Sequence, residues 1–255
     1  MIDNGYIFAK DNTRIFINPS LGCAGECSYC YLPIVGYKNN STNYKTISSQ
    51  KIINQIEKSE LNINKDTLIT LGCYCECWDD YNKKETIDII KYFLEKGNQI
   101  QLSTKKCILK EDLDELLPLI KYYGQFVVFV SSTTISNQSI FERNTTNILE
   151  RLNNFHVLNL LNIPAVLYMK PILKDITIID LELYKKYINQ FNIKDVVVGS
   201  MFTNKISNEQ IHFSTKSKLF YDKNNDEDII ALELSKYTNV YRRSTEVMNE
   251  YKQMS

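Results

Sequence analysis

Short apolar segments alternate with longer segments of helical periodicity along most of the chain. Runs rich in β-branched and aromatic residues predict strands at Arg14–Asn18, Thr67–Leu71, Gln99–Ser103, Phe126–Val130, Ala165–Tyr168 and Asp195–Val198. Between them, apolar residues at helical spacing predict helices at Ser48–Ser59, Lys84–Lys96, Glu111–Lys121, Thr146–Leu161 and Leu181–Gln190. This alternation predicts an α/β fold with a parallel sheet and right-handed crossovers, either flat and doubly wound or curved into a partial barrel.

The alternation occupies the N-terminal four-fifths of the sequence. We therefore expect one α/β domain over residues 1–205 and a C-terminal extension over 206–255, which ends in a short helical tail and covers the domain or its substrate site. The most polar stretch, Lys223–Asp228, predicts a surface loop between the α/β domain and the helical tail. A chain of 255 residues is long enough for one sizeable domain and too short for two comfortable ones.

Composition narrows the class of protein. Lys and Arg together number 30, as do Asp and Glu, so the formal net charge is zero and duplex DNA is not the expected partner. The N-terminal residues have no basic region followed by an apolar run, and no apolar run approaches the roughly 20 residues that span a bilayer. With 7 cysteines and no such signal, we expect a cytoplasmic protein with free or metal-bound thiols.

Three of the cysteines form the motif C-x3-C-x2-C directly after the first predicted strand. Cys23, Cys27 and Cys30 place three soft ligands within eight residues, which suits an iron–sulfur cluster with one iron left open for a non-protein ligand. Structural zinc is an alternative, but it prefers four closed ligands, and the two histidines lie more than a hundred residues away. Ordinary packing is a second alternative, although the glycine and glutamate between the cysteines make a poor apolar face.

The motif resembles the cluster loop of the radical S-adenosylmethionine (SAM) superfamily. Tyr29 occupies the aromatic position before the last cysteine. The resemblance implies that a [4Fe-4S] cluster binds SAM through its open iron. An electron passed through the cluster would cleave SAM to methionine and a 5′-deoxyadenosyl radical, which takes a hydrogen atom from the substrate. The cofactors carry this chemistry, and the protein supplies orientation and the exclusion of competing reactions.

Later motifs resemble the spore photoproduct lyase-like branch of that superfamily. They follow the predicted strands in order, at Asp79–Glu85, Leu102–Lys105, Val130–Thr134, Phe141–Arg143, Glu150–Leu152 and Met169–Leu173. The resemblance implies a partial (β/α)6 TIM barrel with its chemistry at the carboxyl ends of the strands. It also implies that Tyr29, Lys105, Ser131 or Ser132, and Arg151 belong to the SAM site, where a cation can bind a carboxylate. The alternative for each is a strand-end residue bonded to a neighbouring loop.

A second group of thiols follows the second predicted strand. If that strand continued, Cys73, Cys75 and Cys77 would share one face, and Cys107 could approach from the next strand. One interpretation is a second iron–sulfur cluster, which would require the segment to curl, because alternate residues of a strand lie roughly 6.6 Å apart. Another is a catalytic hydrogen-atom donor or sulfur chemistry, for which the resemblance favours Cys77 and then Cys75. The third is packing as small buried hydrophobes.

These observations favour a radical SAM enzyme of the lyase or oxidoreductase type. The expected substrate is a nucleoside, nucleotide or other small metabolite, and the expected electron donor is flavodoxin or ferredoxin. The C-terminal tail, which carries Tyr237, Tyr241, Arg242 and Arg243, is expected to close the substrate site. Two alternatives stay open. One is an activase that places a radical on a glycine of a partner protein, and the other is a non-catalytic metal-binding module.

Overall fold

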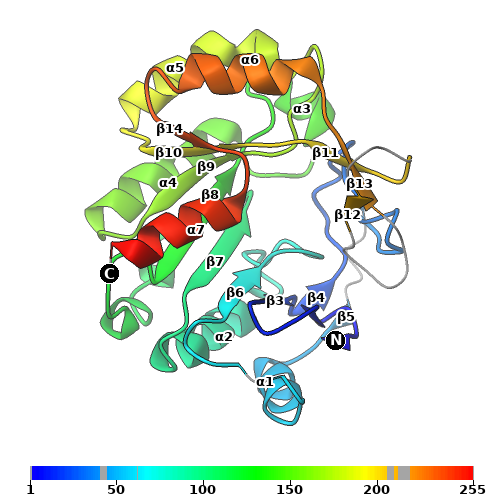
Figure 1. The fold of residues 1–255 in the computed structure, drawn as a ribbon, viewed down its shortest axis with the longest axis vertical. Coiled ribbons are helices and arrows are strands. Elements are labelled where there is room, and N and C mark those ends of the chain that lie inside the picture. The colour runs from blue at the N-terminus through cyan, green and yellow to red at the C-terminus, as the bar shows by residue number, and fades with distance from the viewer. Residues whose placement is uncertain (1, 41–44, 62, 206–209, 212–218, 255) are drawn as a thin grey trace.

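The main feature of the fold is one large, mostly parallel sheet (Figure 1). The computed structural model describes residues 2–40, 45–61, 63–205, 210–211 and 219–254. Within them the sheet has nine strands in the order β1-β2-β3-β6-β7-β8-β9-β10-β14. The parallel strands are β3 (Arg14–Ile17), β6 (Leu68–Leu71), β7 (Ile100–Thr104), β8 (Phe126–Ser131), β9 (Ala165–Met169), β10 (Asp195–Val198) and β14 (Asn239–Tyr241). Two antiparallel strands, β1 (Ile2–Asp3) and β2 (Ile7–Ala9), extend the β3 edge.

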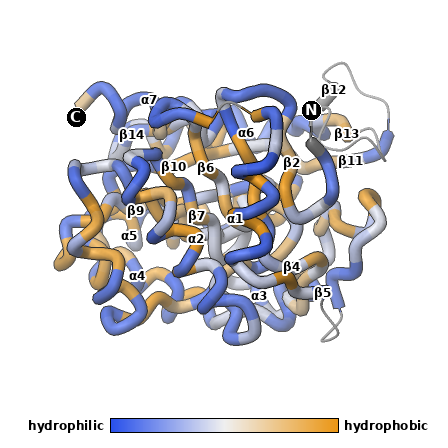
Figure 2. Tube along the Cα trace, turned by 90° about the horizontal axis from the view of Figure 1, so that it is seen from below, coloured by the Kyte–Doolittle hydropathy of each residue, from blue (hydrophilic) through white to orange (hydrophobic). Residues whose placement is uncertain are grey.

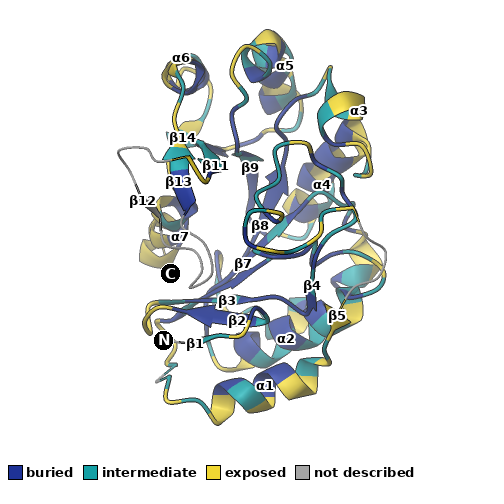
Figure 3. Cartoon of the chain, turned by 90° about the vertical axis from the view of Figure 1, so that its right-hand side faces the viewer, coloured by how far each residue is buried: buried dark blue, intermediate teal, exposed yellow. Residues whose placement is uncertain are grey.

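Helices cover the outer side of this sheet (Figure 3). They are α1 (Ser49–Glu57), α2 (Lys83–Glu95), α4 (Ile148–Leu160), α5 (Leu181–Gln190) and α6 (Asn225–Leu234). A short helix, α3 (Gln138–Phe141), follows β8, whereas the C-terminal α7 (Ser244–Gln253) lies on the inner side of the sheet. Two small sheets pair β4 (Ser20–Leu21) with β5 (Lys45–Thr46), and β13 (Leu219–Asp222) with β11 (Met201–Thr203) and β12 (Gln210–Ile211). No helix of the described ranges is long and apolar enough to cross a membrane.

Alternation along the strands separates a hydrophobic core from a cavity that polar and apolar residues line together. Figure 2 shows the hydrophobic positions concentrated along the inner strands. On the outer side, residues such as Ile15, Ile69 and Leu102 pack against the helices and are fully buried. On the inner side, apolar residues of β8 to β10 pack beneath α7. The inner side of β3, β6 and β7 instead carries Arg14 and other polar residues, which line a cavity.

Most predicted elements are confirmed, with shifts of one or two residues at their ends. The helix predicted at Glu111–Lys121 is wrong, because the segment forms two 3-10 turns, Lys110–Asp112 and Leu117–Leu119. Pro118 lies in the second turn and has no N–H with which to continue an α-helix. The apolar residues that suggested a helix, such as Leu113 and Leu116, instead pack into the core from these turns.

The surface loop predicted at Lys223–Asp228 is also wrong, because α6 begins inside it. Asn224 caps this helix: its side chain accepts a hydrogen bond from the Asp226 N–H, and its own N–H donates to the Glu227 carboxylate. The C-terminal extension also contributes strands as well as helices, since β12 and β13 join a small sheet with β11, and β14 pairs in parallel with β10. Residues 206–209 and 212–218 of the extension lie outside the described residues.

Candidate active site

The three motif cysteines lie in the loop that follows β3, and their side chains line the same cavity. Backbone hydrogen bonds fix the loop: the Cys23 N–H donates to the Lys38 carbonyl at 2.9 Å, and Cys27 forms an isolated antiparallel bridge with Glu142. Gly25 lies between the thiols, where a Cβ would be 3.4 Å from Cys23 Sγ and 3.7 Å from Cys27 Sγ. A residue without a side chain therefore keeps the space beside these sulfurs open.

The thiols suit a soft metal cluster in their number and setting. Burial raises the pKa of Cys23 to about 12 and the pKa of Cys27 to about 11, so both are protonated at neutral pH in the protein alone. Iron would replace those protons, since the thiolate is the ligating form. No three Cys, His, Asp or Glu side chains of the described residues surround a single point as a mononuclear metal site requires. The fit therefore rests on three thiols that share one open cavity.

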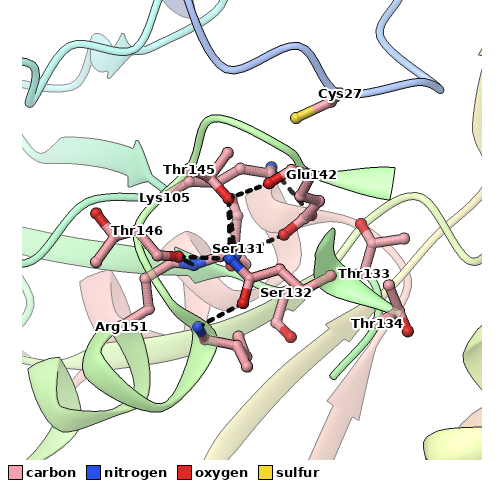
Figure 4. Close-up of polar contacts among 12 residues, drawn as sticks. Cys27, Lys105, Ser131, Ser132, Thr133, Thr134, Glu142, Thr145, Thr146 and Arg151 are labelled. Atoms are coloured by element: carbon pink, nitrogen blue, oxygen red, sulfur yellow. Dashed lines mark hydrogen bonds and ion pairs between the residues drawn. The ribbon is translucent and has the colours of Figure 1, made fainter. Parts of the chain in front are cut away.

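A buried carboxylate, Glu142, connects the cysteine loop to the strand ends (Figure 4). Its side chain is fully buried and accepts hydrogen bonds from the Tyr29 hydroxyl and, at 2.6 Å, from Arg151 Nη2. Lys105 Nζ lies 3.9 Å from Glu142 Oε1, the oxygen that accepts the hydrogen bond from Tyr29. Burial alone would raise the pKa of Glu142, but the cations of Lys105 and Arg151 outweigh burial and bring the pKa below its ordinary value. Glu142 is therefore ionised at neutral pH.

Lys105 stays charged because it is paired with Glu142. Burial alone would lower the pKa of its ammonium group, but the Glu142 carboxylate outweighs this effect, and the pKa lies above its ordinary value. Its Nζ also lies 5.8 Å from the centre of the Tyr29 ring. Lys105 and Tyr29 both line the cavity, as the predicted SAM site requires.

The other predicted SAM contacts divide between the cavity wall and the layer behind it. Ser131 lines the cavity. Arg151 is fully buried behind it and donates to the Ser131 carbonyl at 2.7 Å and to the Thr146 carbonyl at 2.9 Å (Figure 4). The Ser132 hydroxyl lies 2.9 Å from the Tyr184 hydroxyl and is outside the cavity wall. In this arrangement Arg151 acts on the site through Glu142, which it orients.

The second group of thiols is divided by a turn. Strand β6 ends at Leu71, and Gly72 follows with φ +91, where an added Cβ would be 2.7 Å from the Ser103 carbonyl oxygen. The backbone then turns, so the same-face arrangement expected for a continuing strand does not form. Cys73 faces the cavity, and its Sγ lies 3.5 Å from the Tyr31 hydroxyl.

The remaining thiols lie in different settings. Cys75 Sγ and Cys77 Sγ are 3.5 Å apart, but only Cys75 lines the cavity, whereas Cys77 is fully buried in the hydrophobic core. Cys107 is half-buried and outside the cavity wall. Because they occupy the cavity, the core and a separate site, the four thiols do not form one compact ligand group. Of these four thiols, Cys73 and Cys75 are thus the two that line the cavity.

The C-terminal extension contributes to the cavity through the start of α7. Arg243 lines it, together with the neighbouring Ser244. Arg242 instead pairs with Asp228 at 2.5 Å on the surface, and Tyr237 is exposed. Tyr241 lies beside the Asp195 carboxylate, away from the cavity. Of the four tail residues singled out in the sequence, only Arg243 borders the cavity.

Two charged residues of the cavity wall, Glu76 and Arg14, are important for the site although the sequence pattern did not single them out. Glu76, between Cys75 and Cys77, accepts hydrogen bonds from the Thr104 hydroxyl at 2.6 Å and from the Lys105 N–H at 2.8 Å. It thereby connects the end of β7 to the thiol segment. Arg14 is the other, and its signal was a charged residue in an otherwise apolar strand.

Proteins of known structure share this architecture. No protein-family profile matches the sequence, and no curated protein matches it significantly. A solved structure of a spore photoproduct lyase mutant with bound SAM and dinucleoside spore photoproduct is 14% identical, with a TM-score of 0.67 over 92% of this chain and 78% of that chain. The chain has the fold of spore photoproduct lyase. A second mutant structure of that enzyme matches with a TM-score of 0.65 at 14% identity, over 89% of this chain and 76% of that chain.

A further structural neighbour, SuiB from Streptococcus suis bound to SAM, matches with a TM-score of 0.60 at 12% identity. The match covers 92% of this chain but 51% of SuiB. The predicted fold class is therefore confirmed: the parallel sheet is the curved sheet of a partial TIM barrel, not a flat doubly wound sheet. In this fold the cysteine loop follows the first parallel strand of the barrel, β3.

Proposed function

We propose that the chain is a radical SAM enzyme in which Cys23, Cys27 and Cys30 hold a [4Fe-4S] cluster. One observation carries the proposal: the three thiols share a cavity of about 660 Å³ with Tyr29, Lys105 and other residues expected to bind SAM. The spore photoproduct lyase-like fold supports it, because residues at the carboxyl ends of the parallel strands, such as Lys105 and Ser131, line the cavity. When bound, the cluster supplies the electron that cleaves SAM to methionine and a 5′-deoxyadenosyl radical.

The chain's own residues bind and orient the cofactor. Lys105 keeps its charge at the cavity wall and can donate to the carboxylate of SAM. Glu142 holds Lys105 and Tyr29 in place, and Arg151 holds Glu142, so the wall is set before SAM arrives. Ser131 offers its hydroxyl to a polar edge of the nucleoside.

Cys73 is the proposed hydrogen-atom donor, in preference to Cys77 and Cys75. A donor must carry its hydrogen, and burial raises the pKa of the Cys73 thiol to about 12, so it stays protonated at neutral pH. The Tyr31 hydroxyl, 3.5 Å away, fixes the position of the sulfur. The thiol can transfer its hydrogen atom to a substrate-derived radical in the cavity, which leaves a sulfur-centred radical on Cys73.

The variant Cys73→Ala tests whether this thiol is a donor or a metal ligand. We expect its iron content to equal that of the wild type and its release of 5′-deoxyadenosine without substrate to stay within about twofold, because neither step needs the Cys73 hydrogen atom. Cys107→Ala is the matched control, since its half-buried thiol is outside the cavity wall. Iron lost from Cys73→Ala but kept in Cys107→Ala would show that Cys73 binds metal.

The proposed substrate is a small molecule of the nucleoside, nucleotide or metabolite class. The cavity volume of about 660 Å³ suits a ligand of that size beside SAM. The structural neighbour that holds dinucleoside spore photoproduct supports a nucleoside-type ligand. Flavodoxin or ferredoxin is the proposed electron donor. All 7 cysteines are free thiols, which is consistent with a proposed reducing, cytoplasmic setting.

The test of the proposed function is the cleavage of SAM by anaerobically reconstituted protein. With dithionite as the reductant, the protein is expected to release 5′-deoxyadenosine and methionine. A protein that contains the cluster but releases neither product is a metal-binding module and not a radical SAM enzyme. The assay needs no knowledge of the substrate, because both products that it detects come from SAM itself.

A further inference from the structure

A charged side chain, Arg14, faces the cavity from the first parallel strand without a carboxylate partner among the described residues. Its Nε donates to the Thr70 hydroxyl at 2.8 Å, and its Nη2 donates to the Gln101 side chain at 3.0 Å and to the Ser244 hydroxyl at 3.3 Å. These three partners are neutral. The guanidinium carbon also lies 4.6 Å from the centre of the Phe16 ring. Arg14 is thus oriented by polar and aromatic contacts but not neutralised.

The electrostatic setting of Arg14 is unusual for a structural arginine. Burial lowers the pKa of its guanidinium group, which records a loss of hydration around the charge. Partly buried charges are normally paired, because the desolvation of an unpaired ion is costly. The guanidinium offers five N–H donors, and its Nη1 group donates to no other described residue. A charge with free donors beside an open cavity is arranged to meet an anion there.

The other charged groups of the cavity do not neutralise Arg14. Glu142 is committed to Lys105, Arg151 and Tyr29, behind the wall. Glu76 is held by the Thr104 hydroxyl and the Lys105 N–H. The remaining acidic residue of the lining, Asp11, bonds to Thr13.

Lys170, another basic residue of the cavity lining, lies beside aromatic rings. Lys170 Nζ lies 4.9 Å from the centre of the Phe202 ring and 4.7 Å from that of Tyr221, and these two rings stack at 5.5 Å. The two rings belong to the paired strands β11 and β13, and Lys170 directly follows β9. The lining therefore combines Arg14 and Lys170 with further cations, Lys10, Lys105 and Arg243, and with an aromatic wall, which suits an anionic ligand that also has a planar or apolar part.

We propose that Arg14 binds an oxyanion, a carboxylate or phosphate, that the substrate carries into the cavity. The inference rests on the proposed function and narrows its substrate class to anionic small molecules. A planar guanidinium can bind either oxyanion through two parallel hydrogen bonds. Thr70 and Gln101 keep the guanidinium plane fixed, so its free edge stays turned to the ligand.

The test uses reconstituted protein saturated with SAM, and inorganic phosphate and acetate as separate probes at constant ionic strength. Calorimetric titration is expected to detect at least one of the two, and the stronger probe identifies phosphate or carboxylate as the oxyanion. Arg14→Gln is expected to weaken the binding of that probe by about tenfold or more, which corresponds to about 1.4 kcal/mol. Arg14→Lys keeps the charge but not the planar fork, and is expected to weaken the binding less.

The matched control is Arg143→Gln, which removes the same charge from an exposed position outside the cavity wall. It is expected to bind the probe like the wild type. The proposal is overturned if neither probe binds, if Arg14→Gln binds the probe unchanged, or if the probe binds only to protein without SAM. The last result would mean that Arg14 binds the carboxylate of SAM. The proposed function fails separately, through the absence of 5′-deoxyadenosine, and Arg14→Gln is expected to retain that product. If Arg14→Gln does not fold, the single variants Arg14→Lys and Thr70→Val take its place. The proposal is then overturned if both of them bind the probe as tightly as the wild type does.

Discussion

Replacing Arg151 with methionine is expected to lower the free energy of unfolding by about 3–5 kcal/mol, because it leaves a buried charge without its main partner. Arg151 and Glu142 are both fully buried, and their side chains are joined at 2.6 Å. Methionine is of similar length and apolar, so it fills the space but donates no hydrogen bond. The Ser131 and Thr146 carbonyls lose their donor in the same step. Urea unfolding of the metal-free protein measures the loss.

The matched control for this prediction is a surface ion pair of the same kind. Arg242 and Asp228 lie 2.5 Å apart with both side chains substantially exposed, so Arg242→Met is expected to cost less than about 1 kcal/mol. The double variant Arg151→Met with Glu142→Gln is expected to lose less than the two single variants added together, because no unpaired carboxylate is left. A loss below about 1 kcal/mol in Arg151→Met would show that the buried pair does not stabilise the fold.

The effect of Arg151→Met on stability is expected to depend on pH, because Glu142 is a titratable carboxylate. The pKa of Glu142 lies below its ordinary value, so the ion pair contributes stability above the ordinary carboxyl pKa and loses it as the pH falls through the lowered one. The difference in stability between wild type and Arg151→Met is therefore expected to be largest near neutral pH and to shrink in acid. Unfolding curves at several pH values measure this difference, and a gap that widens in acid would contradict the assignment of Glu142 as an ionised partner.

Replacing Cys27 with alanine is expected to remove the cluster and with it all SAM cleavage. Reconstituted wild-type protein should contain about four iron atoms per chain, because each cluster of this type holds four irons. Two remaining cysteines cannot hold a cluster that already has only three protein ligands, so the iron of Cys27→Ala is expected to fall close to zero. Colorimetric iron analysis and the visible absorption of the protein measure the change.

The control for Cys27→Ala is Cys107→Ala, whose thiol is outside the cavity wall. Its iron content is expected to match that of the wild type. Two outcomes would contradict the assignment. Cys27→Ala could retain its iron, or the wild type could contain about eight irons, half of which are lost on replacement of Cys73 or Cys75, which would mean a second cluster.

The sequence predicted the barrel well because its signal is local. Each parallel strand from β3 to β10 is a short apolar run with a helix or loop after it, and such runs need no tertiary information to be found. The terminal strand β14 was missed because three residues, Asn239–Tyr241, carry too little pattern, and their pairing with β10 is decided by the fold. The start of α6 was missed although its signal was present, since Asn224 and Glu227 form a capping box.

The part of the candidate site that depends on residue spacing in the sequence could be predicted. The part that depends on contacts between distant residues could not. The C-x3-C-x2-C spacing located the three thiols that line the cavity. Nothing in the sequence shows that Arg151 turns toward Glu142, because nine residues and a loop separate them. The preference for Cys77 came from the resemblance to the lyase-like branch, whereas in the structure Cys73 lines the cavity after the turn at Gly72 and Cys77 is buried in the core. Charge in an apolar strand was the one available signal for Arg14.

The most direct test of the central claim is SAM cleavage by anaerobically reconstituted protein supplied with dithionite. The products are separated by liquid chromatography and quantified against the iron content of the same sample. If Cys23, Cys27 and Cys30 hold a catalytic cluster, wild-type protein releases 5′-deoxyadenosine and methionine in equal amounts, and Cys27→Ala releases neither. Wild-type protein with about four irons per chain that leaves SAM intact would contradict the claim.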